Sequence, residues 1–468
     1  MLFTSLPFLW LLLGTLLVYY AAARTAALQI GTLVAASLVF YAWEDPALLI
    51  LLALCTGVAA GASWAVAAGT RGGRWQAAGA IALLLGLLAY FKYARFLYGI
   101  FIGAGGHRSP EWDRFLLGVP LPIGISFYVF HGISLLVDTR RGDWKPAPGE
   151  TLPGHLGKTT LYMVFFPQLI SGPITKARDF FPQIPALKKW SDVDLAGAAR
   201  LLVVGYFFKR VVADNLDAET IAMTHPEALS GPRLLLLMVG YSCQIFADFM
   251  GYSTIALGLA RLFGYRLPLN FDRPYASASF SEFWRRWHIS LSAWLRDYLF
   301  IPLGGSRRGT GRTLFNLFLV MFLGGLWHGA AWHYVLWGVL HGAALAAERP
   351  FLPREGAPDW REWPFVRTLR VAFVFAVVTL GWLIFRPHHD GDVAAYLAAM
   401  GRNWRQTVPP GQVWPLLLCC LPVLLHHARP AFAPEGFRPG MERTVLAAML
   451  FLLLVNSGTP GAFIYFQF

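Results

Sequence analysis

Long apolar runs separated by short polar turns dominate the first third of the chain. A helix needs about 20 apolar residues to cross a hydrocarbon core of about 30 Å. Runs of about that length occur at Leu2–Ala22, Thr25–Trp43, Ala47–Ala68, Trp75–Gly103 and Phe115–Val137. The first run has no basic residues in front of it, and a second apolar run follows almost at once, so we interpret it as a retained spanning helix rather than a cleaved signal.

Basic residues alternate between the turns that join these runs. Arg24 lies in the first turn, and Arg71 and Arg74 lie in the third, whereas the second turn holds Glu44 and Asp45. The loop after the fifth run, Asp138–Lys158, is basic again. Because short loops rich in Lys and Arg face the cytoplasm, the pattern predicts an N-terminus outside and this loop inside.

The middle third of the chain is less regular. Apolar runs at Thr160–Ile174 and Leu195–Ala213 are interrupted by prolines or flanked by charge, and Leu234–Phe249 contains Asp248. The segment Gly251–Gly311 is too polar for simple spans and too apolar for a soluble loop. It combines eight arginines with tryptophans such as Trp294, which is typical of short, tilted or re-entrant helices shielded from lipid.

Clean apolar runs return in the last third. They lie at Leu314–Leu326, Ala330–Ala347, Val371–Phe385, Val413–Leu425 and Val445–Val455. The whole pattern predicts an all-α polytopic membrane protein, residues 1–468 forming one domain, with about eleven spans and two or more re-entrant pieces. No repeat is evident, which gives no support to an inverted-repeat transporter.

Composition agrees with a membrane protein. Apolar residues make up 56% of the chain and charged residues 14%, against about 25% charged in a soluble domain, so soluble, disordered and fibrous classes are excluded. The net charge of +13 follows from basic cytoplasmic loops, and nothing resembles a nucleic-acid-binding module. The four cysteines lie in apolar runs without C-x-x-C spacing, so we expect small core residues rather than a metal site.

Three ionisable residues in apolar surroundings are candidates for chemistry, because such residues usually face a cavity or a partner. His328 ends an apolar run within Gly324–Ala330, where glycines allow close approach of backbone or substrate, and an imidazole can accept a hydroxyl proton. The alternative is a histidine packed between helices. Asp248 needs a cation or several donors, and an ion pair that is purely structural is as good an interpretation as a catalytic one.

His288 follows a cluster of aromatic and basic residues. On a helix, Glu282 would face Arg285 and Arg286 and neutralise part of their charge, and the two arginines are good phosphate partners. The alternative is an interfacial amphipathic helix with snorkelling arginines. His333 and His341 do not complete an i, i+4 metal pair with His328, so no metal is expected.

The motifs together resemble the membrane-bound O-acyltransferase family. Trp284–Ser292, followed about forty positions later by Gly325–Gly329, is similar to its signature. Further similar pieces, in chain order, are Phe91–Tyr93, Leu121–Tyr128, Phe165–Ile174, Leu267–Phe271, Pro274–Tyr275, Asp297–Tyr298, Ile301–Gly305 and Phe463–Phe468. The likeness is greatest to the bacterial branch of alginate O-acetyltransferase membrane subunits, with teichoic-acid D-alanyl transferases as cousins.

The resemblance implies a ring of helices around a thin centre that funnels reach from both sides. His328 matches the catalytic histidine and His288 the second, supporting one. Candidates for binding the donor or shaping the centre are Trp287, Trp327, Arg285, Arg286, Asp248 and Asn270. The implied donor is acetyl-CoA, with no cofactor; the implied acceptor is an extracytoplasmic polysaccharide, reached directly or through a periplasmic acetyl-transfer protein, at a bacterial inner membrane.

Two residues depart from the family pattern. Met250 stands where a serine is usual, so any hydrogen bond from that serine is missing, and His131 stands where a glutamine is common. Two alternative functions stay open at this point. One is transfer of D-alanine from a carrier-protein thioester, and the other is a lipid or saccharide transporter without chemistry.

Overall fold

The computed structural model is built from helices. It describes residues 1–70, 72–103, 112–113, 121–351, 363–386, 392–432, 437–459, 461 and 463–464. Helices make up 77% of the structure, with no strand in these ranges, which confirms the all-α prediction. Arg71, the start of the run Phe115–Val137 and the ending Tyr465–Phe468 lie outside the described residues.

The chain divides into two compact units. The first contains residues Met1–Ala199 and Ile255–Pro268, and the second contains Arg200–Thr254 and Leu269–Phe468. The interpretation of residues 1–468 as one domain stays a prediction. So do the ring of helices, its two funnels and the orientation of the loops.

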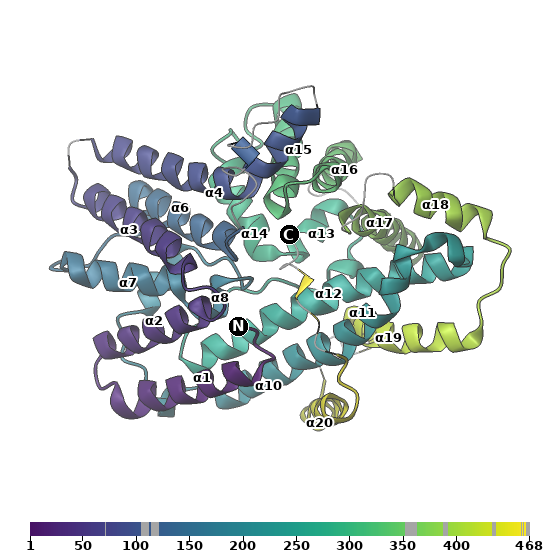
Figure 1. Ribbon diagram of the computed structural model, residues 1–468, viewed down its shortest axis with the longest axis horizontal. Coiled ribbons are helices and arrows are strands. Elements are labelled where there is room, and N and C mark those ends of the chain that lie inside the picture. The colour runs from purple at the N-terminus through teal and green to yellow at the C-terminus, as the bar shows by residue number, and fades with distance from the viewer. Residues whose placement is uncertain are drawn as a thin grey trace. The chain divides into compact units, whose positions relative to one another are not determined.

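The helices of the first unit follow the apolar runs closely (Figure 1). They are α1 (Leu6–Leu17), continued by the π-helix η1 (Val18–Ala22), α2 (Ala26–Ala42), α3 (Leu48–Ala67), α4 (Gly73–Gly103), α6 (Ile125–Arg141), α7 (Leu152–Val164), α8 (Phe166–Leu169) and α9 (Ala177–Phe180). Side-chain oxygens of Ser5, Thr25 and Thr151 accept a backbone N–H in the first turns of α1, α2 and α7. These caps satisfy donors that a helix start leaves open.

Two apolar runs in the first unit form helices with other bounds than predicted. The helix expected at Phe115–Val137 begins at Ile125, because Gly124 has φ +76° and a Cβ there would lie 2.9 Å from the carbonyl oxygen of Leu169. The run Thr160–Ile174 is not one helix. α7 ends at Val164 and the short α8 carries Pro167 in its first turn, because proline has no N–H for the hydrogen bond that would continue α7 and is tolerated at the start of a new helix.

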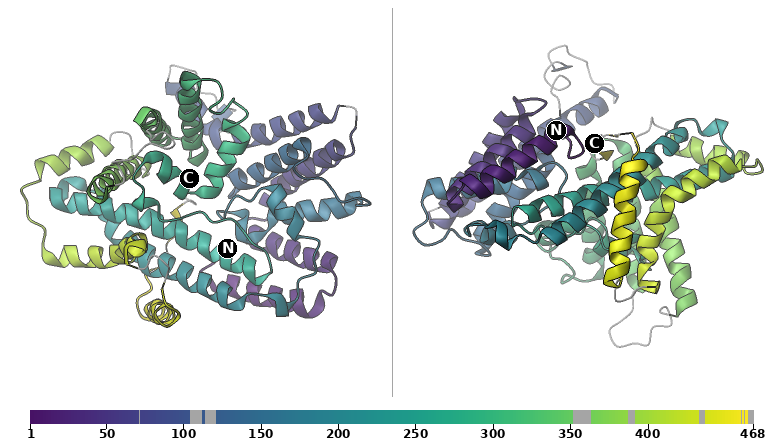
Figure 2. Two further views of the ribbon diagram at one scale, coloured as in Figure 1. Left: turned by 180° about the vertical axis from the view of Figure 1, so that it is seen from behind. Right: turned by 90° about the horizontal axis from the view of Figure 1, so that it is seen from below.

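The second unit contains the remaining helices. They are the last turns of α10 (Leu195–Tyr206), η4 (Phe207–Ala213), α11 (Asp214–Thr220), most of α12 (Gly231–Leu262), α13 (Phe280–Arg286), α14 (Ile289–Leu295), η8 (Arg296–Phe300), α15 (Thr310–His328), α16 (Trp332–Glu348), α17 (Pro364–Phe385), α18 (Asp392–Arg402), α19 (Pro410–Phe432) and α20 (Pro439–Val455). Figure 2 shows the helices from α17 to α20 from behind and from below. The short helices expected within Gly251–Gly311 are confirmed as α13, α14 and η8.

The helix α12 is longer than predicted. The pattern ended it at Phe249, before Gly251, but it continues for three more turns to Leu262. A Cβ on Gly251 would lie 2.8 Å from the backbone nitrogen of Lys209. The glycine therefore allows α12 and η4 to pack backbone against backbone and does not end the helix.

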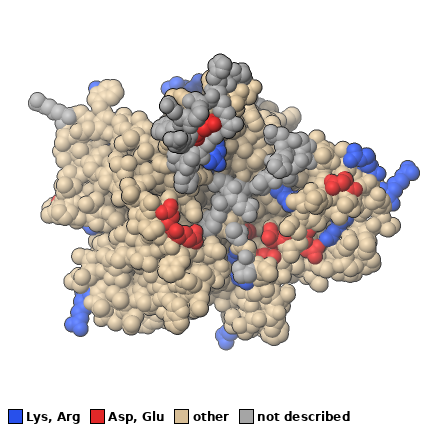
Figure 3. All heavy atoms as spheres, in the orientation of Figure 1, with Lys and Arg blue, Asp and Glu red and all other residues tan. Residues whose placement is uncertain are grey.

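Six helices among the described residues are long and apolar enough to cross a membrane. They are Leu48–Ala67, Gly73–Gly103, Gly231–Leu262, Thr310–His328, Pro364–Phe385 and Pro410–Arg429, and the shorter Leu6–Ala22 and Ala26–Ala42 are also apolar. Large apolar side chains such as Leu454 and Ile50 are at least three-quarters exposed, and few charged residues lie on the face in Figure 3. These features are those of a multi-pass membrane protein; the number eleven stays a prediction.

Candidate active site

The two short helices α13 and α14 frame the residue His288. Side chains cap the N-terminus of α13. Ser279 Oγ accepts the N–H of Glu282 at 2.9 Å, and Glu282 Oε2 accepts the N–H of Ala278 at 2.8 Å. The carboxylate of Glu348 accepts two further N–H groups, from Phe280 and Ser281. Negative charge at a helix N-terminus is favourable, so a helix of only seven residues is held firmly.

His288 itself has a backbone conformation that is rare for its residue type. Its φ is +42° and its ψ is +54°, in the left-handed region, which costs about 1–2 kcal/mol for a residue with a Cβ. Hydrogen bonds on both sides hold it there. Asp272 N donates to Arg286 O at 3.0 Å, and Ile289 N donates to Asn270 O at 3.0 Å. The backbone conformation held by these hydrogen bonds sets the direction of the His288 imidazole at the junction of α13 and α14.

Asn270 is the clamp of this junction. It is 1% exposed, its Oδ1 accepts the hydroxyl of Ser290 at 2.6 Å, and its Nδ2 donates to Ser253 Oγ at 3.0 Å. One side chain thus joins α12 to the first turn of α14. Asn270 was predicted to shape the centre, and that role stays a prediction; its contacts hold the chain at Ser290 and Ile289, next to His288.

We expect Asn270→Ala to destabilise the second unit by about 1–3 kcal/mol, because the buried hydroxyl of Ser290 loses its acceptor. Thermal unfolding of the detergent-purified protein measures the change. Asn456→Ala, at an exposed side chain after α20, is the matched control. Equal midpoints for the two variants would contradict the role of the clamp.

The imidazole of His288 is fully buried among aromatic rings. It meets Phe249 of α12 edge to face, with ring centroids 4.7 Å apart, and lies 6.0 Å from the ring of Trp327. Burial lowers the pKa of His288 to about 3, so the ring is neutral near pH 7. A neutral imidazole can exchange hydrogen bonds with a substrate without paying for a buried charge.

His328 is the last residue of α15, and glycines surround it for a structural reason. A Cβ on Gly325 would lie 2.3 Å from the carbonyl oxygen of Tyr334, and one on Gly329 would overlap the Tyr334 ring. We expected these glycines to allow close approach of backbone or substrate. In the structure they allow the close approach of the backbone and the ring of Tyr334 in α16. The ring of His328 contacts those of Trp337 and Phe385 at 5.1 and 5.2 Å.

A cavity of about 320 Å³ opens beside His328. We call it the His328 cavity. Its lining is mostly apolar, from α14, α15 and α16, and the polar or ionisable side chains in it belong to Ser281, Trp284, Arg285, Ser292, Arg296, His328 and Trp337. Mainly apolar walls with a few polar groups are typical of a small-molecule site.

The predicted site residues are distributed unevenly around this cavity. Of the eight, His328 and Arg285 line it, and Trp327 bridges the rings of His288 and His328, which lie 6.0 and 5.0 Å from its own. Trp287 is 1% exposed and packs on Phe283 and Trp382. These stacked rings make Trp287 part of the aromatic core beneath His288.

The two arginines of the signature differ in their surroundings. Arg286 forms the expected ion pair with Glu282 at 2.8 Å, which confirms the helical spacing. Arg285 donates to Ser281 Oγ at 3.2 Å and lines the His328 cavity. Arg296 lines the cavity too and was not predicted as a site residue, because in the sequence it is one of eight arginines in the same segment.

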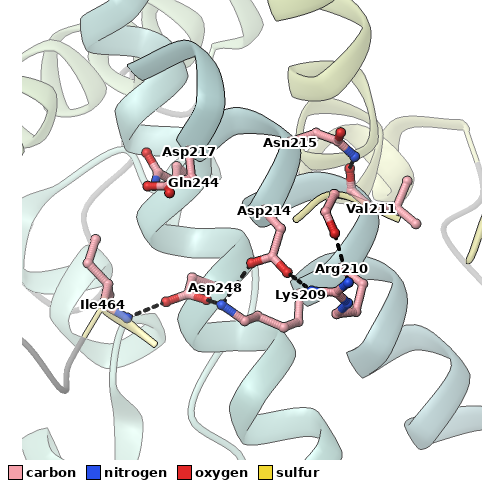
Figure 4. Close-up of polar contacts among 10 residues, drawn as sticks. Lys209, Arg210, Val211, Asp214, Asn215, Asp217, Gln244, Asp248 and Ile464 are labelled. Carbon is pink, nitrogen blue, oxygen red and sulfur yellow. Dashed lines mark hydrogen bonds and ion pairs between the residues drawn. The ribbon is translucent and has the colours of Figure 1, made fainter. Parts of the chain in front are cut away.

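Asp248 belongs to a separate polar cluster, drawn in Figure 4. Its Oδ1 pairs with Lys209 Nζ at 2.6 Å, and Lys209 also contacts Asp214 Oδ1 at 2.9 Å. Arg210 pairs with Asp214 in turn. We call these four residues the Lys209 cluster. The cation that Asp248 was expected to need is thus Lys209, and Asp248 also lines a second cavity of about 110 Å³.

Sequence reasoning missed Lys209. Its signal is a lysine inside the apolar run Leu195–Ala213, 39 residues before an aspartate inside another apolar run. The two residues that depart from the family pattern, Met250 and His131, are both buried inside helices. Met250 is buried in α12, where its Sδ accepts the hydroxyl of Thr254 at 3.6 Å. His131 is buried in α6 of the first unit, against the ring of Tyr162.

Comparison with known proteins identifies the family. The model of the membrane-bound O-acyltransferase family matches residues 155–385. The chain is 39% identical to the "probable alginate O-acetylase AlgI" of Pseudomonas putida, over 86% of this chain and 80% of that protein. The chain belongs to the membrane-bound O-acyltransferase family.

Other relatives from this family differ in the group they transfer and in the acceptor named for them. The chain is 32% identical to a peptidoglycan O-acetyltransferase of Helicobacter pylori, over 67% of this chain and 62% of that protein. It is 30% identical to a teichoic acid D-alanyltransferase of Bacillus subtilis, over 57% and 69%. The family match and the names of these relatives show that the protein is an acyltransferase of the membrane. All eight predicted site residues lie within the matched region, and their roles stay predictions.

Proposed function

We propose that the protein transfers acetyl groups from acetyl-CoA at the cytoplasmic side of a bacterial inner membrane to hydroxyls of an extracytoplasmic polysaccharide. The acceptor would be an alginate-like glycan, or a periplasmic acetyl-transfer protein that completes the reaction. The observation that carries the proposal is the His328 cavity, in which a histidine at the end of α15 faces a space with two arginines on its wall.

The chemistry follows from these residues. His328 takes the proton of the acceptor hydroxyl while that oxygen attacks the thioester carbonyl, the new C–O bond forms and the C–S bond breaks. The imidazolium returns its proton to the departing thiolate. Arg285 and Arg296 would pair with phosphates of the donor, since guanidinium–phosphate hydrogen bonds are charge-assisted.

The names of the relatives support acetyl as the transferred group. Two of the three relatives described are named for O-acetylation, and their acceptors are named as alginate and peptidoglycan. The similarity to a D-alanyltransferase supports a second candidate function, transfer of D-alanine. The donor in that candidate would be a carrier-protein thioester. Membership of an acyltransferase family disfavours the third, a transporter without chemistry.

A reconstituted assay tests the proposal. The purified protein in proteoliposomes receives labelled acetyl-CoA on one side and a hydroxyl-bearing oligosaccharide on the other, with and without a periplasmic partner protein. We expect labelled ester on the oligosaccharide or on the partner. Transfer from a D-alanyl carrier protein, with none from acetyl-CoA, would replace the proposal with the second candidate.

The arginines of the cavity give a prediction for the donor. Arg285→Ala or Arg296→Ala should raise KM for acetyl-CoA about tenfold or more, since a hydrogen bond to a charged group contributes about 1.5–3 kcal/mol. Initial rates over a range of donor concentrations measure it. Arg286→Gln is the matched control, because Arg286 pairs with Glu282 and does not line the His328 cavity. A KM that rises equally in the control would contradict the assignment.

A further inference from the structure

The segment that follows α20 is attached to the Lys209 cluster by its backbone. Gly458 N donates to Arg210 O at 2.9 Å, and Arg210 Nη2 donates to Gly458 O at 2.7 Å. Further along, Ile464 N donates to Asp248 Oδ2 at 2.7 Å (Figure 4). A Cβ on Gly458 would lie 2.7 Å from the backbone carbon of Asp214, so the chain approaches as closely as glycine permits.

The formal charges of the Lys209 cluster sum to zero, and one of its carboxylate oxygens accepts a hydrogen bond from this segment. Lys209 and Arg210 carry two positive charges against two negative charges on Asp214 and Asp248. Asp248 uses Oδ1 for Lys209 and Oδ2 for Ile464. A buried carboxylate needs several donors, and one of these donors is supplied by the tail.

The residue before Ile464 leads from the cluster to the candidate active site. Phe463 is 1% exposed and stacks on Tyr252, with ring centroids 4.6 Å apart, and it contacts Phe249 at 5.9 Å. Phe249 is the ring that meets His288 edge to face at 4.7 Å. Phe463 therefore packs behind Phe249, on the ring that contacts His288.

We propose that the tail (residues 456–459, 461 and 463–464), held by the Lys209 cluster, positions His288 through Phe463 and Phe249. Phe463, Lys209 and Asp248 are positioning residues, not catalytic ones. The part of this inference that concerns acyl transfer rests on the proposed function; the packing of His288 does not. The alternative is a tail that contributes only to stability.

Chemical labelling of histidine distinguishes these alternatives without any activity. Diethyl pyrocarbonate acylates neutral, accessible imidazoles, and mass spectrometry of the digested protein gives a rate for each histidine. We expect Phe463→Ala to raise the labelling rate of His288 about tenfold relative to wild type, as a local opening made easier by about 1.4 kcal/mol. His341 is an internal control, because it is buried against Phe283, Trp284 and Trp337 instead.

Two further variants protect the test against misfolding. Leu454→Ala changes an exposed side chain near the end of α20 and should leave the labelling of His288 unchanged. Ile464→Pro removes the N–H that Asp248 accepts and should expose His288 as Phe463→Ala does. Equal labelling of His288 in wild type, Phe463→Ala and Ile464→Pro overturns the inference, and so does a parallel rise at His341.

The kinetic readout separates this inference from the proposed function. Phe463→Ala should lower kcat about tenfold and leave KM for acetyl-CoA within about twofold, because none of the tail residues that the structure describes lines the His328 cavity. A rise in KM with unchanged kcat overturns the positioning role. If the wild-type protein transfers no acetyl group, the proposed function fails, and the labelling result still decides where the tail acts.

Discussion

His328→Ala is expected to lower kcat for acetyl transfer by about 100- to 10,000-fold, the range that general-base catalysis contributes. The side chain is 5% exposed and lies at the wall of the His328 cavity. Loss of the imidazole removes the group that takes the hydroxyl proton, and it leaves the arginines of the cavity in place. KM for acetyl-CoA should therefore stay within about threefold of wild type.

His333→Ala is the matched control for this prediction. His333 lies in the first turn of α16, five residues after His328, and its ring contacts Tyr334. It does not line the His328 cavity, so kcat should change little. Two variants with equal losses would mean that the region needs its histidines for folding, and the role of His328 as base would be contradicted.

The second large effect concerns the Lys209 cluster. Lys209→Met leaves Asp214 paired with Arg210 and leaves Asp248 with the N–H of Ile464 in place of its cation. Removal of one partner from a buried ion pair costs about 3–5 kcal/mol. The same holds for Asp248→Leu, which leaves Lys209 with Asp214 alone. Either single variant should lower the thermal midpoint strongly, as measured by unfolding in detergent.

The double variant Lys209→Met with Asp248→Leu should recover most of that loss. It removes one charge of each sign, and Arg210 and Asp214 still form their pair. Replacing a buried ion pair by apolar residues is often neutral for stability. A double variant as unstable as the sum of the singles would contradict the coupling of these two residues.

Much of the fold could be predicted from apolar runs, because a run of about 20 residues has few alternatives in a membrane. The runs Thr25–Trp43 and Ala47–Ala68 match α2 and α3 within one residue at each end. The continuation of α12 through Gly251 could not be predicted. A glycine ends a helix or allows close packing, and the backbone of Lys209 against it decides between the two.

The sequence predicted individual residues of the candidate site, but it did not predict which of them lie together. The spacing of Glu282 and Arg286 is local, so their ion pair follows from helix geometry. The partners of Asp248 are 39 and 216 residues away in the chain, and periodicity carries no information over such separations. Likewise, nothing in the sequence separates Arg296 from the other arginines of its segment, and its place on the wall of the His328 cavity depends on the fold around η8.

The central claim is that the thioester reacts beside His328. Cryo-electron microscopy of the protein with CoA bound tests it most directly. We predict density for the thiol end of CoA inside the His328 cavity, with its sulfur near the His328 ring and its phosphates near Arg285 and Arg296. CoA bound elsewhere on the protein, with the His328 cavity empty of it, would contradict the account.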